Sequence, residues 1–105
     1  MKSVFYQKLL VQKIEKEYED YKKEILSKHP IEIFNKAWQI DTIRCIYEIL
    51  MEDRRTMPKA YVRFLVLKPN ILGYFYKRWM EVPDLEGEQL RKCMMSVLRL
   101  EGQAG

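Results

Sequence analysis

The sequence predicts an all-α fold: a compact single-domain bundle of about five helices with a long N-terminal amphipathic helix. Apolar residues recur at spacings of three and four along most of the chain, which is the period of one helix face. Prolines divide these stretches into segments of helix length, at Pro30, Pro58, Pro69 and Pro83. The alternation of apolar and polar residues that marks a strand is missing. We expect residues 1–101 to form the domain and residues 102–105 to form a flexible tail.

The first segment, residues 3–28, reads as one long amphipathic helix. Its apolar stripe consists of Val11, Ile14, Tyr18, Tyr21 and Ile25. Lysines and glutamates fill the gaps, as in a solvated helix face with ion pairs between neighbouring turns. His29 and Pro30 end this helix, because the residue before a proline disfavours the α conformation. His29 is the only histidine, and we expect a structural or capping role for it.

Residues 30–51 continue the helical pattern, and the sequence leaves open whether this segment is one helix. Its stripe consists of Ile33, Phe34, Ala37, Trp38, Ile40, Ile43, Ile46, Tyr47 and Leu50. A break is expected, if anywhere, near Asp41.

Three shorter helices are predicted after residue 53. Thr56 is expected to cap the first of them, with Ala60, Phe64 and Leu67 along its buried face. Asn70 is expected to cap a helix over residues 71–80, in spite of a glycine inside it. The last helix ends near residue 102, and its apolar positions are Leu90, Met94, Val97 and Leu98.

Residues 71–80 contain both apolar and cationic side chains. At helical spacing Ile71, Leu72, Phe75 and Trp79 fall on one side. Tyr74, Lys77 and Arg78 are then left facing outwards, and the orientation of Tyr76 stays open. We expect Trp38, Phe75 and Trp79 to be buried together in the core.

Positive charge is concentrated in the second half of the chain. Residues 1–52 hold nine Lys/Arg and nine Asp/Glu, whereas residues 53–105 hold ten and six. Seven cations and no acid lie between Arg54 and Met80. Such a region attracts anionic partners. The candidate partner-binding residues are Arg54, Arg55, Lys59, Tyr61, Arg63, Lys68, Tyr74, Lys77 and Arg78. The alternative is that these charges only solubilise two helices.

No catalytic, cofactor or metal site is predicted. One histidine and two isolated cysteines, Cys45 and Cys93, match neither a His-based triad nor the spacing of a zinc site. A glycine-rich phosphate loop is missing, so we expect a non-enzyme that needs no cofactor. The N-terminal residues do not resemble a signal peptide, no apolar run is long enough to cross a bilayer, and we therefore expect a cytoplasmic protein of a bacterial host cell.

The order of motifs between Leu26 and Trp79 resembles a family of small helical proteins of unknown function, carried on phages and mobile elements of anaerobic bacteria. The matching positions are Pro30, Glu32, Ile33, Ala37, Trp38, Ile46, Thr56, Pro69, Leu72, Tyr76 and Trp79. They cover about half of the chain. The acidic turn of the family is here Asp53-Arg54-Arg55, and its paired prolines are reduced to Pro69. The resemblance implies a small accessory protein of a mobile element.

Three functional classes follow from these observations. The first is a stoichiometric inhibitor that binds a host defence effector, such as a CRISPR effector or its nucleic-acid-handling surface, as anti-CRISPR proteins do. The second is a direct nucleic-acid binder, because cations interleaved with aromatic residues suit phosphate contacts and base stacking. The third is a structural or assembly homodimer that uses exposed tyrosines of the long first helix.

Overall fold

The computed structural model describes residues 2–81 and 89–102, and in these residues the backbone is helical without a strand. The predicted all-α bundle with a long N-terminal helix is therefore confirmed. The elements are α1 (Lys2–Leu26), α2 (Pro30–Asn35), α3 (Ala37–Asp53), a 3₁₀ turn (Arg54–Thr56), α4 (Lys59–Val66), α5 (Ile71–Met80) and α6 (Gln89–Glu101).

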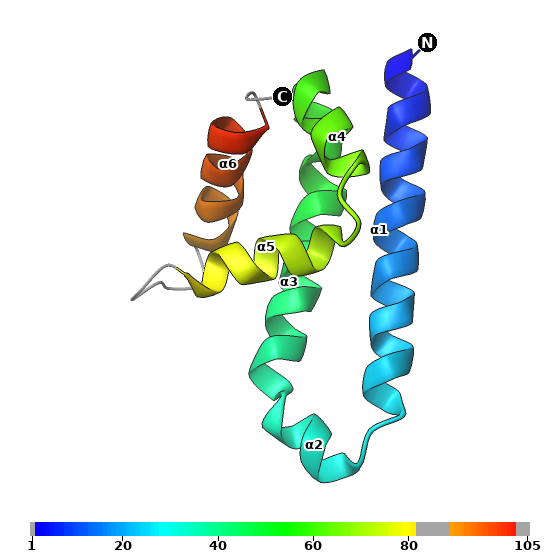
Figure 1. Cartoon of the computed structure of the whole chain (residues 1–105), viewed down its shortest axis with the longest axis vertical. Coiled ribbons are helices and arrows are strands. Elements are labelled where there is room, and N and C mark those ends of the chain that lie inside the picture. The colour runs from blue at the N-terminus through cyan, green and yellow to red at the C-terminus, as the bar shows by residue number, and fades with distance from the viewer. Residues whose placement is uncertain (1, 82–88, 103–105) are drawn as a thin grey trace.

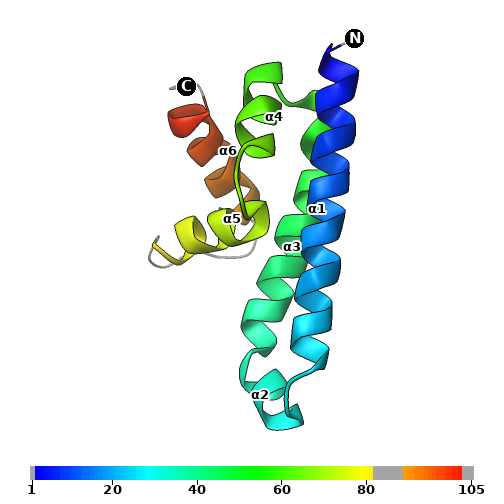
Figure 2. The ribbon, with the colours of Figure 1, turned by 45° about the vertical axis from the view of Figure 1, so that its right-hand side comes forward.

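The architecture is a long helical hairpin with three short helices packed on one end of it. α1 and α3 run antiparallel, side by side, and α2 joins them at the far end (Figures 1 and 2). α4 packs on α1, α5 crosses both long helices, and α6 returns against α5 and α3. The α2 end therefore consists of the hairpin alone, whereas the opposite end is several helices thick (Figure 1).

The core lies where the short helices meet the hairpin. Its buried residues come from every α-helix except α2 and, through Met57, from the link before α4; they form one cluster, consisting of Leu10, Ile14, Ile43, Ile46, Leu50, Met57, Tyr61, Val62, Leu65, Ile71, Leu72, Phe75, Trp79, Leu90, Met94, Val97 and Leu98. The predicted inner faces of α5 and α6 are confirmed. Helical spacing on each element collects these side chains on one face, and burial of that face stabilises the bundle.

The segment 30–51 is interrupted, but at Lys36 rather than near Asp41. Lys36 separates α2 from α3, and its N–H still bonds back to the carbonyls of Glu32 and Ile33. The helical path is therefore bent more than broken. His29 caps α2, because its Nδ1 accepts a hydrogen bond of 3.2 Å from the Ile31 N–H. The capping role expected for the only histidine is confirmed.

The prediction that Thr56 caps α4 is wrong. Thr56 lies in the 3₁₀ turn, and its Oγ1 donates to the Asp53 carbonyl at 3.0 Å instead of accepting from α4. Pro58 holds the N-cap position without a side-chain bond. The proline starts the helix by its fixed φ, while the threonine closes the preceding turn.

The buried face of α4 was also wrongly predicted. Tyr61, Val62 and Leu65 are buried, whereas Ala60 and Leu67 are exposed and Phe64 is half-buried. Both sets have helical spacing, so the period alone does not distinguish them. Packing decides: the Tyr61 ring lies against Gly102 at the end of α6.

Trp38 is not in the core. Its side chain is 56% exposed, whereas Phe75 and Trp79 are buried as expected. Trp38 lies one residue into α3, next to the end where only the hairpin exists, and its ring lies 6.2 Å from that of Tyr76. The position satisfies the stripe pattern, but Tyr76 of α5 covers the ring only in part, and Trp38 lines an open cavity together with Trp79 and Leu90.

The tyrosines of α1 pack inside the chain. Tyr18 stacks on Tyr47 of α3 with ring centroids 4.3 Å apart, and the Tyr21 hydroxyl donates to Gln39 Oε1 at 3.0 Å. Tyr18 and Tyr21 therefore join the two arms of the hairpin. The exposed tyrosine seam considered for a homodimer is not formed by them.

α5 begins at a doubly capped N-terminus. Asn70 Oδ1 accepts from the Gly73 N–H at 3.0 Å, as predicted. Glu17 of α1 accepts from the Ile71 and Leu72 N–H groups, with both oxygens at 2.9 Å. A Cβ at Gly73 would overlap the Asn70 amide and displace this cap, so the glycine leaves room for it. A carboxylate at this end also complements the partial positive charge of the helix N-terminus.

Of the tail expected at 102–105, the structure describes only Gly102. Its N–H donates to the Leu98 carbonyl at 2.7 Å, and the residue is buried against Tyr61. The remaining residues of that expected tail, 103–105, lie outside the described residues.

The first prediction concerns Glu17. Replacing it by glutamine leaves one acceptor for two N–H groups and removes the charge, so we expect a loss of about 2 kcal/mol in the free energy of unfolding. Urea unfolding followed by circular dichroism at neutral pH measures it. Glu19→Gln is the matched control, because Glu19 forms an exposed ion pair with Lys22 and should change stability by under about 0.5 kcal/mol. Equal unfolding midpoints for the two variants would contradict this role of Glu17.

Candidate anion-binding groove

A groove of about 710 Å³ lies between the first half of α1 and the turn that leads into α4. Its lining residues are Val4, Gln7, Lys8, Val11, Gln12, Arg54, Arg55, Met57 and Lys59. Four of them are cations and none is acidic. We call this site the basic groove.

The turn on one side of the basic groove is held in place by its backbone. Gln7 Nε2 donates to the Arg54 carbonyl at 2.8 Å, which ties α1 to the 3₁₀ turn. The Met57 side chain is buried and anchors the turn to the core. The Arg54 guanidinium is itself occupied, because Nη1 donates to the Met51 carbonyl. Arg55 and Lys59 are exposed beside it.

Lys8 is the cation that sequence reasoning missed. It reaches the basic groove from α1, far from the basic segment in sequence. A signal was present, because residues 1–14 contain lysines and no acidic residue; the first acid is Glu15. Two acid-free stretches of the chain therefore face each other, and together they raise the local positive potential.

The structure does not bring the other predicted site residues into this groove. Arg63 lies over the Tyr6 ring, with 5.6 Å from Cζ to the centroid. Lys68 Nζ lies 4.5 Å from the Phe64 centroid and 4.4 Å from the Tyr74 centroid. These cations cover half-buried aromatic rings, an interaction that orients the charged group.

Tyr74 and Arg78 are engaged by an acid from outside the basic segment. The Tyr74 hydroxyl donates to Glu101 Oε1 at 2.6 Å, and Arg78 Nη2 lies 2.8 Å from Glu101 Oε2. Burial and the hydrogen bond to Glu101 raise the pKa of Tyr74 above its ordinary value. The end of α6 thus neutralises part of the charge of α5.

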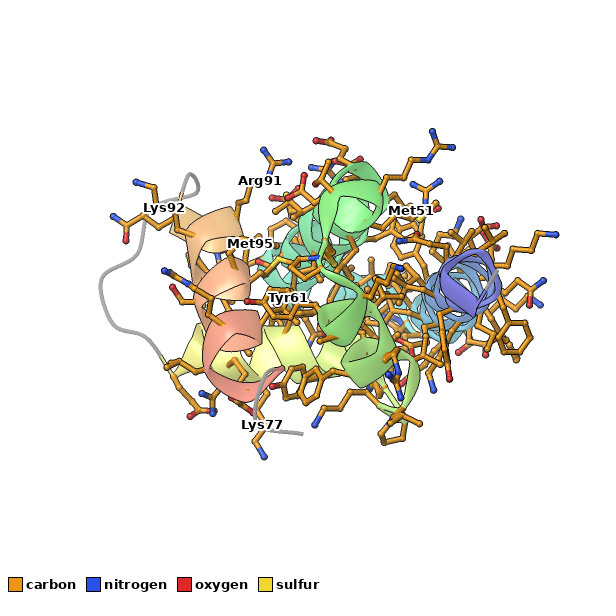
Figure 3. All side chains as sticks on the ribbon, turned by 90° about the horizontal axis from the view of Figure 1, so that it is seen from above. Met51, Tyr61, Lys77, Arg91, Lys92 and Met95 are labelled. Atoms are coloured by element: carbon orange, nitrogen blue, oxygen red, sulfur yellow. The ribbon has the colours of Figure 1, made fainter. Side chains whose placement is uncertain are left out.

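Tyr61 and Lys77 complete the predicted set. Tyr61 is only 6% exposed and lies between α4 and α6 (Figure 3), so its ring is not part of a surface. It was expected outside because α4 was assigned the wrong inner face. Lys77 is exposed on α5 and points away from the bundle (Figure 3).

The residues with catalytic or metal-binding chemistry are dispersed. Within residues 2–81 and 89–102, no three His, Cys, Asp or Glu side chains are grouped so as to hold a metal ion. Cys45 and Cys93 are free half-buried thiols, and burial raises the pKa of both. The absence of an enzyme activity and of a cofactor stays a prediction.

In the described part of the chain, the helices are too short or too polar to span a bilayer.

The search for similar proteins was negative: no protein-family model, curated protein or solved structure matches the chain.

The second prediction uses Tyr74. Tyr74→Phe removes the hydroxyl bond to Glu101 and should lower the free energy of unfolding by about 1 kcal/mol near neutral pH. In the unfolded chain tyrosine loses its proton near its ordinary pKa of 10.0, while the folded state keeps it. The stability that the hydroxyl contributes is therefore complete below pH 10.0 and is lost above it.

Urea unfolding of both proteins across the alkaline range checks this. The difference in the free energy of unfolding between the wild type and Tyr74→Phe should narrow as the pH rises past the ordinary tyrosine pKa of 10.0. In the control, Glu101→Gln, the carboxylate charge is gone, so the same comparison should show a weaker pH dependence. A gap that stays constant would show that Glu101 does not hold the proton on Tyr74.

Proposed function

We propose that the chain is a non-enzymatic binding protein whose basic groove receives an anionic surface of a partner protein. The observation that carries this proposal is the convergence of four cations from two distant segments, with no acid among the lining residues. These cations line a groove, which suits a partner that projects into it.

The apolar part of the basic groove favours a protein partner over a bare phosphate backbone. Val4 is exposed, Val11 is half-buried, and Met57 closes the floor. An apolar centre with charged residues around it is typical of protein interfaces. A partner that offers carboxylates around an apolar side chain would match both features.

The partner class follows from the resemblance to mobile-element proteins. We propose a stoichiometric inhibitor of a host defence effector. Nucleases among such effectors bind divalent metal ions through clustered carboxylates, and those clusters are the kind of anionic surface that the basic groove would cover. Occupying that surface blocks the handling of nucleic acid without any chemistry by the inhibitor.

Direct nucleic-acid binding is the second candidate, and one observation favours it. Arg63 and Lys68 lie beside the rings of Tyr6, Phe64 and Tyr74, a combination that suits phosphates and bases. These rings are only partly accessible and are already covered by the cations. The basic groove itself contains no aromatic residue, so base stacking is not available there.

The third prediction is a charge reversal of the groove. The triple variant Lys8→Glu, Arg55→Glu and Lys59→Glu should keep its helical content, because exposed positions usually change stability by under about 0.5 kcal/mol each. It should associate with the partner at least about 10-fold more slowly, because steering by opposite charge is lost. Arg54 is left unchanged, because its guanidinium is used inside the fold.

The measurement starts from capture of the partner out of nuclease-treated host lysate, followed by association kinetics with the purified partner at several salt concentrations. Lys77→Glu, Lys92→Glu and Arg99→Glu together are the matched control: the same change of net charge at exposed positions outside the groove. Labelled duplex and single-stranded DNA serve as separate probes. If the wild type bound either DNA in the absence of the partner, and the groove variant did not, direct nucleic-acid binding would be favoured. If the groove variant associated with the partner as fast as the wild type, the basic groove would be excluded as the binding site.

A further inference from the structure

The α1 wall of the basic groove is one face of a helix. Five residues of α1 line the groove at helical spacing: Val4, Gln7, Lys8, Val11 and Gln12. Val4 and Val11 are seven residues apart, which is two turns or about 11 Å at the rise of an α-helix. Figure 1 shows this part of α1 beside α4. The basic groove therefore follows α1 over about two turns.

The basic groove has an apolar strip with cations on both sides. Val4 is 59% exposed and Val11 is half-buried, so both leave apolar surface open in the groove. Lys8 lies on the α1 wall, and Arg55 and Lys59 belong to the opposite wall. All three of these cations are exposed. An occupant that matches this arrangement offers an apolar strip with anionic groups along both of its sides.

The acids that are nearest to the basic groove in sequence do not cancel its charge. Glu52 and Asp53 precede the turn, and Arg91 of α6 binds them at 2.7 Å and 3.1 Å, respectively. On α1 the first acid is Glu15, about one turn beyond Gln12. The attraction for anions is therefore strongest along the two turns of α1 that line the groove.

The walls of the basic groove, as far as the chain is described, offer no strand edge. Residues 7–12 lie inside α1, where N–H and carbonyl groups bond to one another. Across the groove, the Arg54 carbonyl accepts from Gln7 Nε2 and from the Met57 N–H. An extended segment in the groove would bury backbone groups without a strand to pair with, and each unpaired group is costly. A helix avoids this cost, because it bonds its backbone internally.

We propose that the basic groove takes an acidic amphipathic helix of the partner protein. The helix lays an apolar stripe over Val4 and Val11. Its aspartates or glutamates flank the stripe and face Lys8 on one side and Arg55 and Lys59 on the other. The recognised segment has apolar residues at positions i, i+3 or i+4, and i+7. This inference rests on the proposed function, because it specifies the anionic surface as a helix.

A synthetic peptide tests this proposal without the partner. The probe is about 14 residues long, with leucines along one helix face and glutamates on both sides of them; a peptide of this length is only marginally helical when free. Titration calorimetry should show that the chain binds it, and the chemical shifts of the isotope-labelled peptide should become helical on binding.

Two further peptides are controls for the shape of the occupant. One has the composition of the probe with the leucines scattered around the helix. The other has a proline at its centre, which breaks a helix but is compatible with an extended segment. Each should bind at least about 10-fold more weakly than the probe, because the first lacks the apolar stripe and the second cannot form the helix.

A single substitution in the chain tests the apolar strip. Val4→Asp puts an acid into the groove and should weaken binding of the probe at least about 10-fold, because like charges then face each other. The fold should be unchanged, because Val4 is exposed and an acid is favourable near a helix N-terminus. Leu67→Asp is the matched control: it makes the same charge change at an exposed apolar residue outside the groove and should bind the probe like the wild type.

Failure of this proposal can be distinguished from failure of the proposed function. If the partner associates equally fast with the wild type and with the triple charge-reversal variant, the groove is not the binding site and both fail. If that variant loses the partner, but the scattered or the proline peptide binds as tightly as the probe, the helix is excluded as the occupant. The helix is also excluded if the probe does not bind or does not compete with the partner. In these last cases the groove takes an extended or folded anionic surface.

Discussion

The pair of hydrogen bonds that the start of α5 donates to Glu17 is the constraint on which the short-helix end of the molecule depends. α1 and α3 can associate through Tyr18, Tyr47 and their apolar stripes, but this contact does not determine where α5 crosses them. The carboxylate of Glu17 does so, because it accepts from two backbone N–H groups and lies on a helix that is already anchored by Ile14. Once α5 is placed, Phe75 and Trp79 enter the core and α6 has a surface to pack on.

The two ends of the hairpin have different chemistry, and their separation is a consequence of helix length. Lys8 and Leu26 lie on the same helix, about 27 Å apart at the rise of an α-helix. The basic groove carries excess positive charge around an apolar floor, whereas the α2 end exposes the apolar side chains of Ile31 and Phe34. A partner at one end does not compete with a partner at the other.

Sequence patterns predicted the helices and most of the core, because period, prolines and capping residues are local signals. The position of Asn70 directly before an apolar segment predicted it as a helix cap, and the spacing of Phe75 and Trp79 predicted them as core residues. What failed was the choice between equivalent faces. α4 has apolar residues on two sides, and its packing on α1 and against Gly102 buries Tyr61 more deeply than Phe64.

The site was predicted in part, for the same physical reason. A run of cations in sequence does not say which of them share a surface, because a helix turns successive residues away from one another. Arg55 and Lys59 meet in the groove, but Arg78 is drawn to Glu101, and Lys8 arrives from another helix. Trp38 shows the opposite error: its spacing fits the core, yet in the described part of the chain its ring is covered only in part, by Tyr76.

The last turn of α6 also has a consequence for how the protein is made. Leu98 is fully buried, Glu101 is bonded to Tyr74 and Arg78, and Gly102 lies against Tyr61. These contacts join the last described residues to α4 and α5, which are synthesised earlier. During translation the hairpin can assemble first, but apolar surface of α4 and α5 stays uncovered until Glu101 has emerged from the ribosome. Until α6 packs, the newly made chain presents apolar surface that chaperones bind and that aggregation uses.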